Sequence, residues 1–374
     1  MSADLLEKLE AIDLAILTDV VRQDRGDPAL VLLDWTVSPL SHEKIIDTTG
    51  GLFCFNVQGQ GEQGIQSWKV VLKCINNPKQ WAQEPRGWPY WKREVLAFHS
   101  GFLGQLPVGV RAPRCYGVVE NEDGAWVWLE YIQESTSRQW SLEHFQRAAR
   151  QLGRFQGAYL NGTPLVDQPW LSQFFTSVWG KDDFWIKHMD PAVEENAWQS
   201  PITQRGWDDR QKSRVLQLIS ERERFFEANQ RLPQVLCHND AHRRNLMWTR
   251  SAQSGAEELI GVDWAFCGIG ALGNDLGELV GNSLYFFDYH LQDVEAFEAA
   301  QMEGYLAGLT EVGAEVDPRL TRLGYLISLS FLMGAMLPGW AALMLPPESG
   351  TNVQAMYGHS VEEVLAGFNW TPFT

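Results

Sequence analysis

The chain has 374 residues, of which 45% are hydrophobic and 21% charged, a composition typical of a globular protein with enough apolar material for a sizeable core. Its 47 acidic side chains outnumber its 30 basic ones, and the formal net charge of −17 argues against a nucleic-acid partner, whose phosphates would be repelled. The five cysteines form no CxxC pair, and the acidic N-terminus lacks the layout of a signal peptide, so we expect reduced thiols and a cytoplasmic location.

The first part of the chain has mainly strand patterns. Residues 1–25 carry leucine and isoleucine near helical spacing and predict an amphipathic helix. Apolar segments separated by turn residues then predict five strands, at 35–45, 52–57, 67–75, 115–119 and 125–132. One helix is predicted at 90–102. We interpret residues 1–133, including the N-terminal helix, as a small N-terminal lobe.

Helical patterns dominate residues 134–374, which we interpret as a C-terminal lobe. Ser141 is predicted to cap a helix whose apolar side chains share one face up to about residue 160. Short apolar segments on either side of residues 238–245, and a third that leads to Asp263, are predicted to be strands. Together the two parts predict an α+β fold.

A long uncharged segment runs from Leu323 to Leu345 and could span a bilayer by its length. Pro338 and Gly339 interrupt it, and no basic cluster marks a flank. We therefore interpret it as a buried helix and predict no membrane partner.

The sequence HNDAHRRN, residues 238–245, concentrates polar side chains between two short apolar segments. Asp263 follows in VDW, at the end of a predicted strand. An Asn and an Asp that converge from neighbouring strand ends can share a magnesium ion, which prefers oxygen ligands and takes few from protein. With Asn245 and Asp263 on the metal, Asp240 would remain free to orient and deprotonate an attacking hydroxyl. Phosphoryl transfer requires this division of roles.

Lys73 lies within an apolar strand segment, where an unpaired ammonium group would be costly. We predict that it pairs with Glu94 on the following helix. The alternative is a lysine on the exposed face of an edge strand.

Residues 35–345 resemble the aminoglycoside phosphotransferase and choline kinase superfamily, relatives of the protein kinases. The motif H-x-D-x-x-x-x-N is matched by His238, Asp240 and Asn245, and the strand-end aspartate by Asp263. Gly270, Asp275 and Leu276 match G-x-x-x-x-D-L downstream. The resemblance implies a two-lobed protein-kinase-like fold, with a small antiparallel sheet lobe and a larger helical lobe that carries the substrate site. It also implies ATP and Mg²⁺ as cofactors, and the hydroxyl of a small molecule as the phosphate acceptor.

The resemblance implies roles in the helical lobe. Asp240 would be the catalytic base, His238 a brace for its loop, and Asp275 a structural acid, with Asn245 and Asp263 as metal ligands. Arg243 and Arg244 replace a Pro-Gly pair often found in the motif; they could contact phosphate or be solvated, and we expect both to be solvated.

The resemblance implies cofactor contacts in the first lobe as well. Lys73 and Glu94 would hold the phosphates, and backbone groups of Glu130 and Ile132 would contact adenine. Gly50 and Gly51 resemble the phosphate loop, although Leu52 and Phe53 replace its usual polar residues.

Two function classes follow. The first is an ATP- and Mg²⁺-dependent phosphotransferase, whose acceptor could be an amino alcohol, a sugar or an antibiotic-like molecule. The alternative is a catalytically idle nucleotide-binding regulator of the same fold. A protein kinase is disfavoured because Trp264, rather than Phe-Gly, follows Asp263. The sequence leaves open the acceptor and the oligomeric state.

Overall fold

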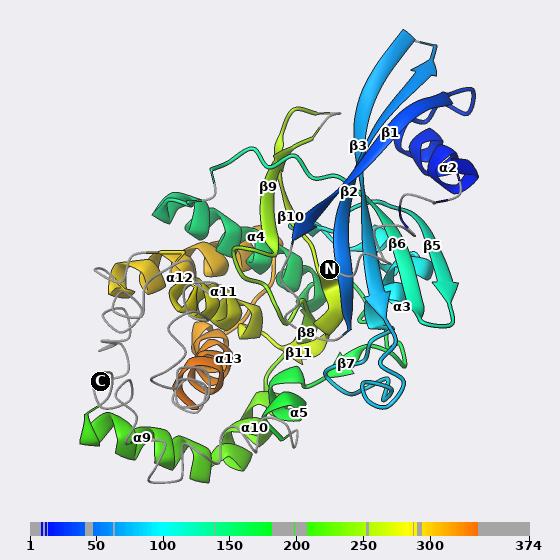
Figure 1. The fold of residues 1–374 in the computed structure, drawn as a ribbon. Coiled ribbons are helices and arrows are strands. Elements are labelled where there is room, and N and C mark those ends of the chain that lie inside the picture. The colour runs from blue at the N-terminus through cyan, green and yellow to red at the C-terminus, as the bar shows by residue number, and fades with distance from the viewer. Residues whose placement is uncertain are drawn as a thin grey trace.

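The computed structural model describes residues 9, 12, 14–41, 48–62, 64–137, 139–181, 198, 208–251, 254–286, 288–289 and 294–335. The predicted strands of the first part form a five-stranded antiparallel sheet in the order β1–β2–β3–β6–β5 (Figure 1). The strands are β1 (Val31–Ser41), β2 (Thr49–Gly61), β3 (Gly64–Asn76), β5 (Cys115–Asn121) and β6 (Gly124–Glu130).

A different helix packs against each face of this sheet. Helix α2 (Leu14–Arg25) packs Leu17 and Val21 into one core cluster with Phe55 and Leu72 of the sheet. On the other face lies α3 (Arg93–His99), which is followed by a 3₁₀ helix (Phe102–Gln105). Because strand side chains alternate between faces, β3 directs Lys73 to the α3 side.

Helices make up most of the described residues after β6. Two helices, α4 (Leu142–Leu160) and α12 (Val294–Glu311), pack along each other. Ser141 caps α4 as predicted, because its side chain accepts from the backbone N–H of His144. Further helices in the described part are α5 (Phe175–Lys181), α9 (Asp209–Ser220), α10 (Arg222–Arg231), α11 (Asn274–Tyr285) and α13 (Pro318–Leu329), with a 3₁₀ helix at Trp264–Phe266.

Two three-stranded sheets connect these helices. One has the order β4–β10–β9 and the other β7–β11–β8. Their strands are β4 (Val110–Arg111), β7 (Ser172–Gln173), β8 (Gln234–Cys237), β9 (Leu246–Arg250), β10 (Glu257–Gly261) and β11 (Gly268–Ala271). The polar residues 238–245 form the β8–β9 loop, and Asp263 follows β10, so these short strands bring the two motifs together.

The uncharged segment is partly described. It begins within α13 and continues through a π-helix, Ser330–Ala335, while its residues 336–345 lie outside the described part. Among the residues that are described, no helix has the length and apolar character that a membrane crossing requires.

Candidate active site

Lys73 lies between two carboxylates from distant parts of the chain. Its Nζ is 2.6 Å from Glu94 Oε2 and 2.8 Å from Asp263 Oδ1. Glu94 is almost fully buried, and its other oxygen accepts the backbone N–H of Trp264 at 3.1 Å. The predicted Lys73–Glu94 pair is therefore present, and it also holds the segment that carries Asp263.

These contacts fix the charges of the group. Burial disfavours the charged form of Lys73, but the attraction of Asp263 and Glu94 outweighs it and raises the pKa. Burial likewise disfavours charge on Asp263, yet the nearby Lys73 ammonium holds the pKa of this carboxyl below its ordinary value. Lys73 and Asp263 thus face each other as a charged pair.

The β8–β9 loop is fastened at its start by Asp275 of α11. The Asp275 carboxylate accepts the backbone N–H groups of His238 and Asn239, at 2.8 and 2.9 Å, and the side-chain amide of Gln156 at 2.9 Å. Burial raises the pKa of Asp275 to about 6, against the effect of these backbone donors. Asn239 has a φ of 60°, so the chain turns sharply just before Asp240.

Two side chains of the same loop hold the Asp240 carboxylate. Asn245 donates from Nδ2 to Oδ2 at 2.7 Å, and His242 Nε2 lies 3.2 Å from Oδ1. His242 Nδ1 accepts the backbone N–H of Arg244 at 3.2 Å, so Nε2 is the ring nitrogen that faces Asp240. Asp240 is about three-quarters buried, with 25% of its side chain exposed, and is held in one orientation.

His238 braces the loop from the other side. Its Nε2 donates to the carbonyl of Val262 at 3.0 Å, and its ring lies 4.5 Å from that of Trp264, centroid to centroid. Burial lowers the pKa of His238 to about 4, so the ring is neutral near pH 7. These contacts fix the start of the β8–β9 loop against the segment that carries Asp263.

Asn245 and Asp263 are suited to share a divalent cation. The backbone N–H of Val262 donates to the carbonyl of Asn245 at 2.8 Å, which places the two ligand-bearing segments side by side. The side-chain amide nitrogen of Asn245 donates to Asp240, and in this orientation Oδ1 of Asn245 remains available to bind a cation. Within the described residues no group of three or more His, Cys, Asp or Glu could hold a metal. A hard cation with few protein ligands, completed by phosphate and water, fits this pair.

Thr48 and Thr49 mark the end of the β1–β2 connection next to Lys73. Together with Lys73, Glu94 and Asp263 they line a small cavity of about 30 Å³. Sequence reasoning missed both threonines, although they belong to DTTGGLF, the segment that contains the predicted phosphate-loop residues Gly50 and Gly51.

The two glycines of that segment lie inside β2. A Cβ on Gly50 would lie 2.7 Å from Asn76 Oδ1, and Gly51 has a φ of 145° at a bulge of the β2–β3 register. Glycine is therefore required by close packing at position 50 and by the backbone conformation at position 51.

The face of the sheet that carries Lys73, here termed the cleft face, changes from apolar to polar side chains along its strands. Ser38, Cys54, Val71 and Leu129 form a mainly apolar row across four strands, next to Lys73. The next row outward begins with Thr36, Asn56 and Lys69. The Lys69 ammonium lies 4.9 Å from the centre of the Tyr131 ring.

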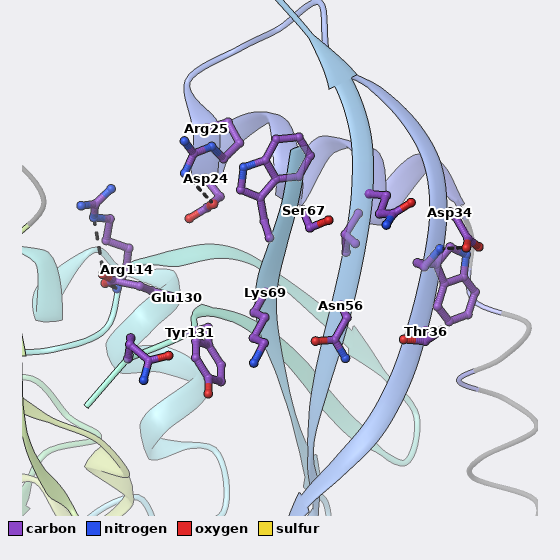
Figure 2. Close-up of a pocket in the computed structure, with 15 residues that line it drawn as sticks. Asp24, Arg25, Asp34, Thr36, Asn56, Ser67, Lys69, Arg114, Glu130 and Tyr131 are labelled. Carbon is purple, nitrogen blue, oxygen red and sulfur yellow. Dashed lines mark hydrogen bonds and ion pairs between the residues drawn. The ribbon is translucent and has the colours of Figure 1, made fainter. Parts of the chain in front are cut away.

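This outer row lines a cavity of about 580 Å³ (Figure 2). Glu130, Tyr131 and Gln133 border it together with Asp24 and Arg25 of α2, so the cavity extends around the edge of the sheet beyond the end of β6. The Glu130 side chain is held by Arg111 at 2.6 Å and by the backbone N–H of Arg114 at 3.0 Å. Ile132, which lies between Tyr131 and Gln133 in the chain, is partly buried.

Arg93 is a site-supporting residue that sequence reasoning missed. It precedes Glu94, is fully buried, and within the described part of the chain donates to backbone carbonyls, including those of Trp170 and Ala265, both at 2.8 Å. Burial lowers the pKa of Arg93 to about 10. The one signal in the sequence was a charged residue between Lys92 and Glu94 at the start of an apolar helix.

The tryptophans between residues 170 and 207 belong to the core where they are described. Trp170, Trp179 and Trp198 are all less than 9% exposed and lie in hydrophobic clusters. Trp185 and Trp207 lie outside the described residues.

Residues 92–315, more than half of the chain, match the phosphotransferase enzyme family, and the chain belongs to this family. It is an enzyme of the small-molecule kinase class. No curated protein matches the sequence.

Similar solved structures include the amicoumacin kinase hAmiN in complex with AMP-PNP, Ca²⁺ and Ami, at 16% identity and a TM-score of 0.50, covering 98% of this chain and 97% of that one. An aminoglycoside phosphotransferase from Alicyclobacillus acidocaldarius has 13% identity, a TM-score of 0.48, and coverage of 88% and 86%. The phosphotransferase APH(3'')-Id from Streptomyces rimosus has 16% identity, a TM-score of 0.41, and coverage of 86% and 99%. The likeness to the amicoumacin kinase confirms the predicted protein-kinase-like fold.

Proposed function

We propose that the chain transfers the γ-phosphate of ATP to a hydroxyl group of a small molecule, with Mg²⁺ as the cation. The observation that carries this proposal is the convergence of Lys73, Glu94 and Asp263 beside a loop that presents Asp240 and Asn245. Positioning and charge stabilisation supply most of the catalysis in such transfers, and these residues offer both.

The nucleotide would lie along the cleft face of the sheet. Lys73 would contact its phosphates, and the apolar row with Cys54 and Val71 suits the flat face of a base. Lys69 is four residues, or about 13 Å, from Lys73 along β3, so the base would end near Glu130 and Ile132. Gly50 and Gly51 would let the backbone approach the phosphates closely.

In the reaction, Asp240 accepts the proton of the acceptor hydroxyl as its oxygen forms a bond to the γ-phosphorus. The bond from that phosphorus to the β–γ bridging oxygen breaks, and ADP leaves with the electron pair. His242 and Asn245 hold the carboxylate in line during this transfer. Bound through Asn245 and Asp263, Mg²⁺ would neutralise the phosphate charge.

The test is to replace Asp240 with Asn. We expect phosphate transfer to fall by about 10²- to 10⁴-fold, because the base is lost, while the affinity for an ATP analogue stays within a few-fold. The acceptor would first be found by measuring ATP consumption with amino alcohols, sugars, aminoglycosides and macrolides. Asp123→Asn, at an exposed turn, is the matched control and should turn over like the wild type.

A D240N protein that transfers phosphate at the wild-type rate would contradict the assigned base. A wild-type protein that binds ATP but consumes none with any acceptor would instead favour the idle regulator.

A further inference from the structure

Arg243 does not have the solvated position expected from the sequence. It is 6% exposed, although it lies in the polar β8–β9 loop three residues after Asp240. Its guanidinium is 2.8 Å from Glu134 Oε1, donates to the carbonyl of Ser137 at 3.2 Å, and lies over the Trp140 ring at 4.6 Å. All these partners lie in the chain between β6 and α4.

The partners of Arg243 also bind one another. Thr136 donates from Oγ1 to the same Glu134 oxygen at 3.2 Å, and Trp140 donates from Nε1 to Thr136 at 3.2 Å. Arg243, Glu134, Thr136 and Trp140 therefore form a closed set of contacts. Arg243 and Trp140 are buried and Glu134 and Thr136 partly buried, so the loss of one charged member leaves its partner uncompensated.

The same stretch of chain is fixed to β9. The backbone N–H of Ser135 donates to the carbonyl of Trp248 at 2.7 Å, and Thr249 Oγ1 donates to the carbonyl of Gln133 at 2.9 Å. Residues 133–137, here termed the connecting segment, thus start at the cleft border formed by Glu130 and end in contact with the β8–β9 loop.

Arg243 and Arg244 contact different parts of the chain. Arg244 has its guanidinium 4.1 Å from the Phe286 ring centre and 3.7 Å from Asp288, beyond α11. Asp240 is held by Asn245 and His242, and Arg243 instead contacts the connecting segment. An ion pair with a planar guanidinium can fix a loop in one position, because several donors act in a rigid arrangement.

We propose that Arg243 is a positioning residue, which through Glu134 ties the connecting segment to the β8–β9 loop and so sets the place of Asp240 relative to the nucleotide. This inference rests on the proposed function. It adds a residue that touches neither nucleotide nor acceptor but on which the rate of transfer depends.

The test uses the full chain and four variants, Arg243→Met, Arg243→Lys, Glu134→Gln and the neutral double variant with Arg243→Met and Glu134→Gln. Turnover of MgATP is measured with the acceptor that gives the highest rate, and is divided by the number of sites that bind an ATP analogue in calorimetry. Arg150→Met is the matched control, because it removes a surface ion pair of α4 with Glu311.

We expect Arg243→Met and Glu134→Gln each to lower kcat per binding site by about ten- to a hundredfold, with KM for MgATP and the analogue Kd within about threefold. The double variant should lose no more than either single one, because both changes remove the same contact. Arg243→Lys should recover part of kcat. If Arg243→Met does not fold, Arg243→Lys and Glu134→Gln carry the test.

Unchanged kcat per site in these variants, with or without a lower melting temperature, would overturn the positioning role and leave the proposed function intact. A wild-type chain without turnover would overturn the proposed function and this inference together.

Discussion

His238 is held neutral by its surroundings, and this has consequences for stability. Its ring is 1% exposed, with Nε2 bonded to Val262, and burial lowers the pKa to about 4. In the unfolded chain a histidine titrates near about 6.5. As pH falls below that value, the unfolded chain takes up the proton first, so the stability from neutral His238 is lost between about pH 6.5 and pH 4.

Replacement of His238 by Gln should remove this titration. Between pH 7 and pH 4 the free energy of unfolding should fall by up to about 3 kcal/mol more in the wild type than in the variant. Burial raises the pKa of Asp275 and of Glu278, which favours the fold at low pH in both proteins. The comparison between the two proteins therefore carries the test.

Urea unfolding at several pH values measures this difference. Between pH 7 and pH 8 the two stability curves should run parallel. Parallel curves down to pH 4 would show that His238 gains its proton in the fold as readily as in the unfolded chain.

At the scale of elements, α4 and α12 support the site because glycines in α12 let the two helix backbones pack directly against each other. A Cβ on Gly304 would fall on the carbonyl oxygen of Gln146, and one on Gly308 on that of Arg150. The two helix backbones therefore approach closely. Between them Tyr305 donates to Gln156, whose amide donates to Asp275 below the β8–β9 loop.

Gly308→Ala should separate these helices. We expect a loss of about 1–3 kcal/mol in the free energy of unfolding, because the added methyl group has no space beside the backbone of Arg150. Gly117→Ala is the matched control, since an added Cβ there meets no atom within 4 Å. Denaturant titration gives both values, and equal stability of the two variants would contradict the close packing.

Most elements near the site could be predicted from local patterns. The five strands of the first sheet, the capped helix after Ser141 and the three strands around the β8–β9 loop are present. Strands β4, β7 and β11 were missed, because two to four residues carry too little periodicity to be recognised.

The candidate site was predictable where a motif fixes spacing, as for Asp240 and Asn245. The site was not predictable where a contact depends on the tertiary fold. Arg243 was expected to be solvated, yet a tryptophan and a glutamate more than a hundred residues earlier bury it. Arg93 is similar, since its partners are backbone carbonyls that no side-chain pattern reveals.

At the scale of the whole molecule, the sheet and the helical part meet through charged contacts. Lys73 links β3 to Glu94 of α3 and to Asp263 after β10. Arg111 links Glu130 at the end of β6 to Glu258 of β10, at 2.6 and 3.2 Å. The proposed nucleotide cleft therefore has ion pairs at both its phosphate end and its base end.

A crystal structure of the full chain with a non-hydrolysable ATP analogue and Mg²⁺ tests the central claim most directly. We predict a Mg²⁺ ion bound by Asn245 Oδ1 and the Asp263 carboxylate, phosphates on Lys73, and Asp240 facing the γ-phosphate across the space for a hydroxyl. An analogue bound elsewhere, or a metal that touches neither Asn245 nor Asp263, would contradict the account.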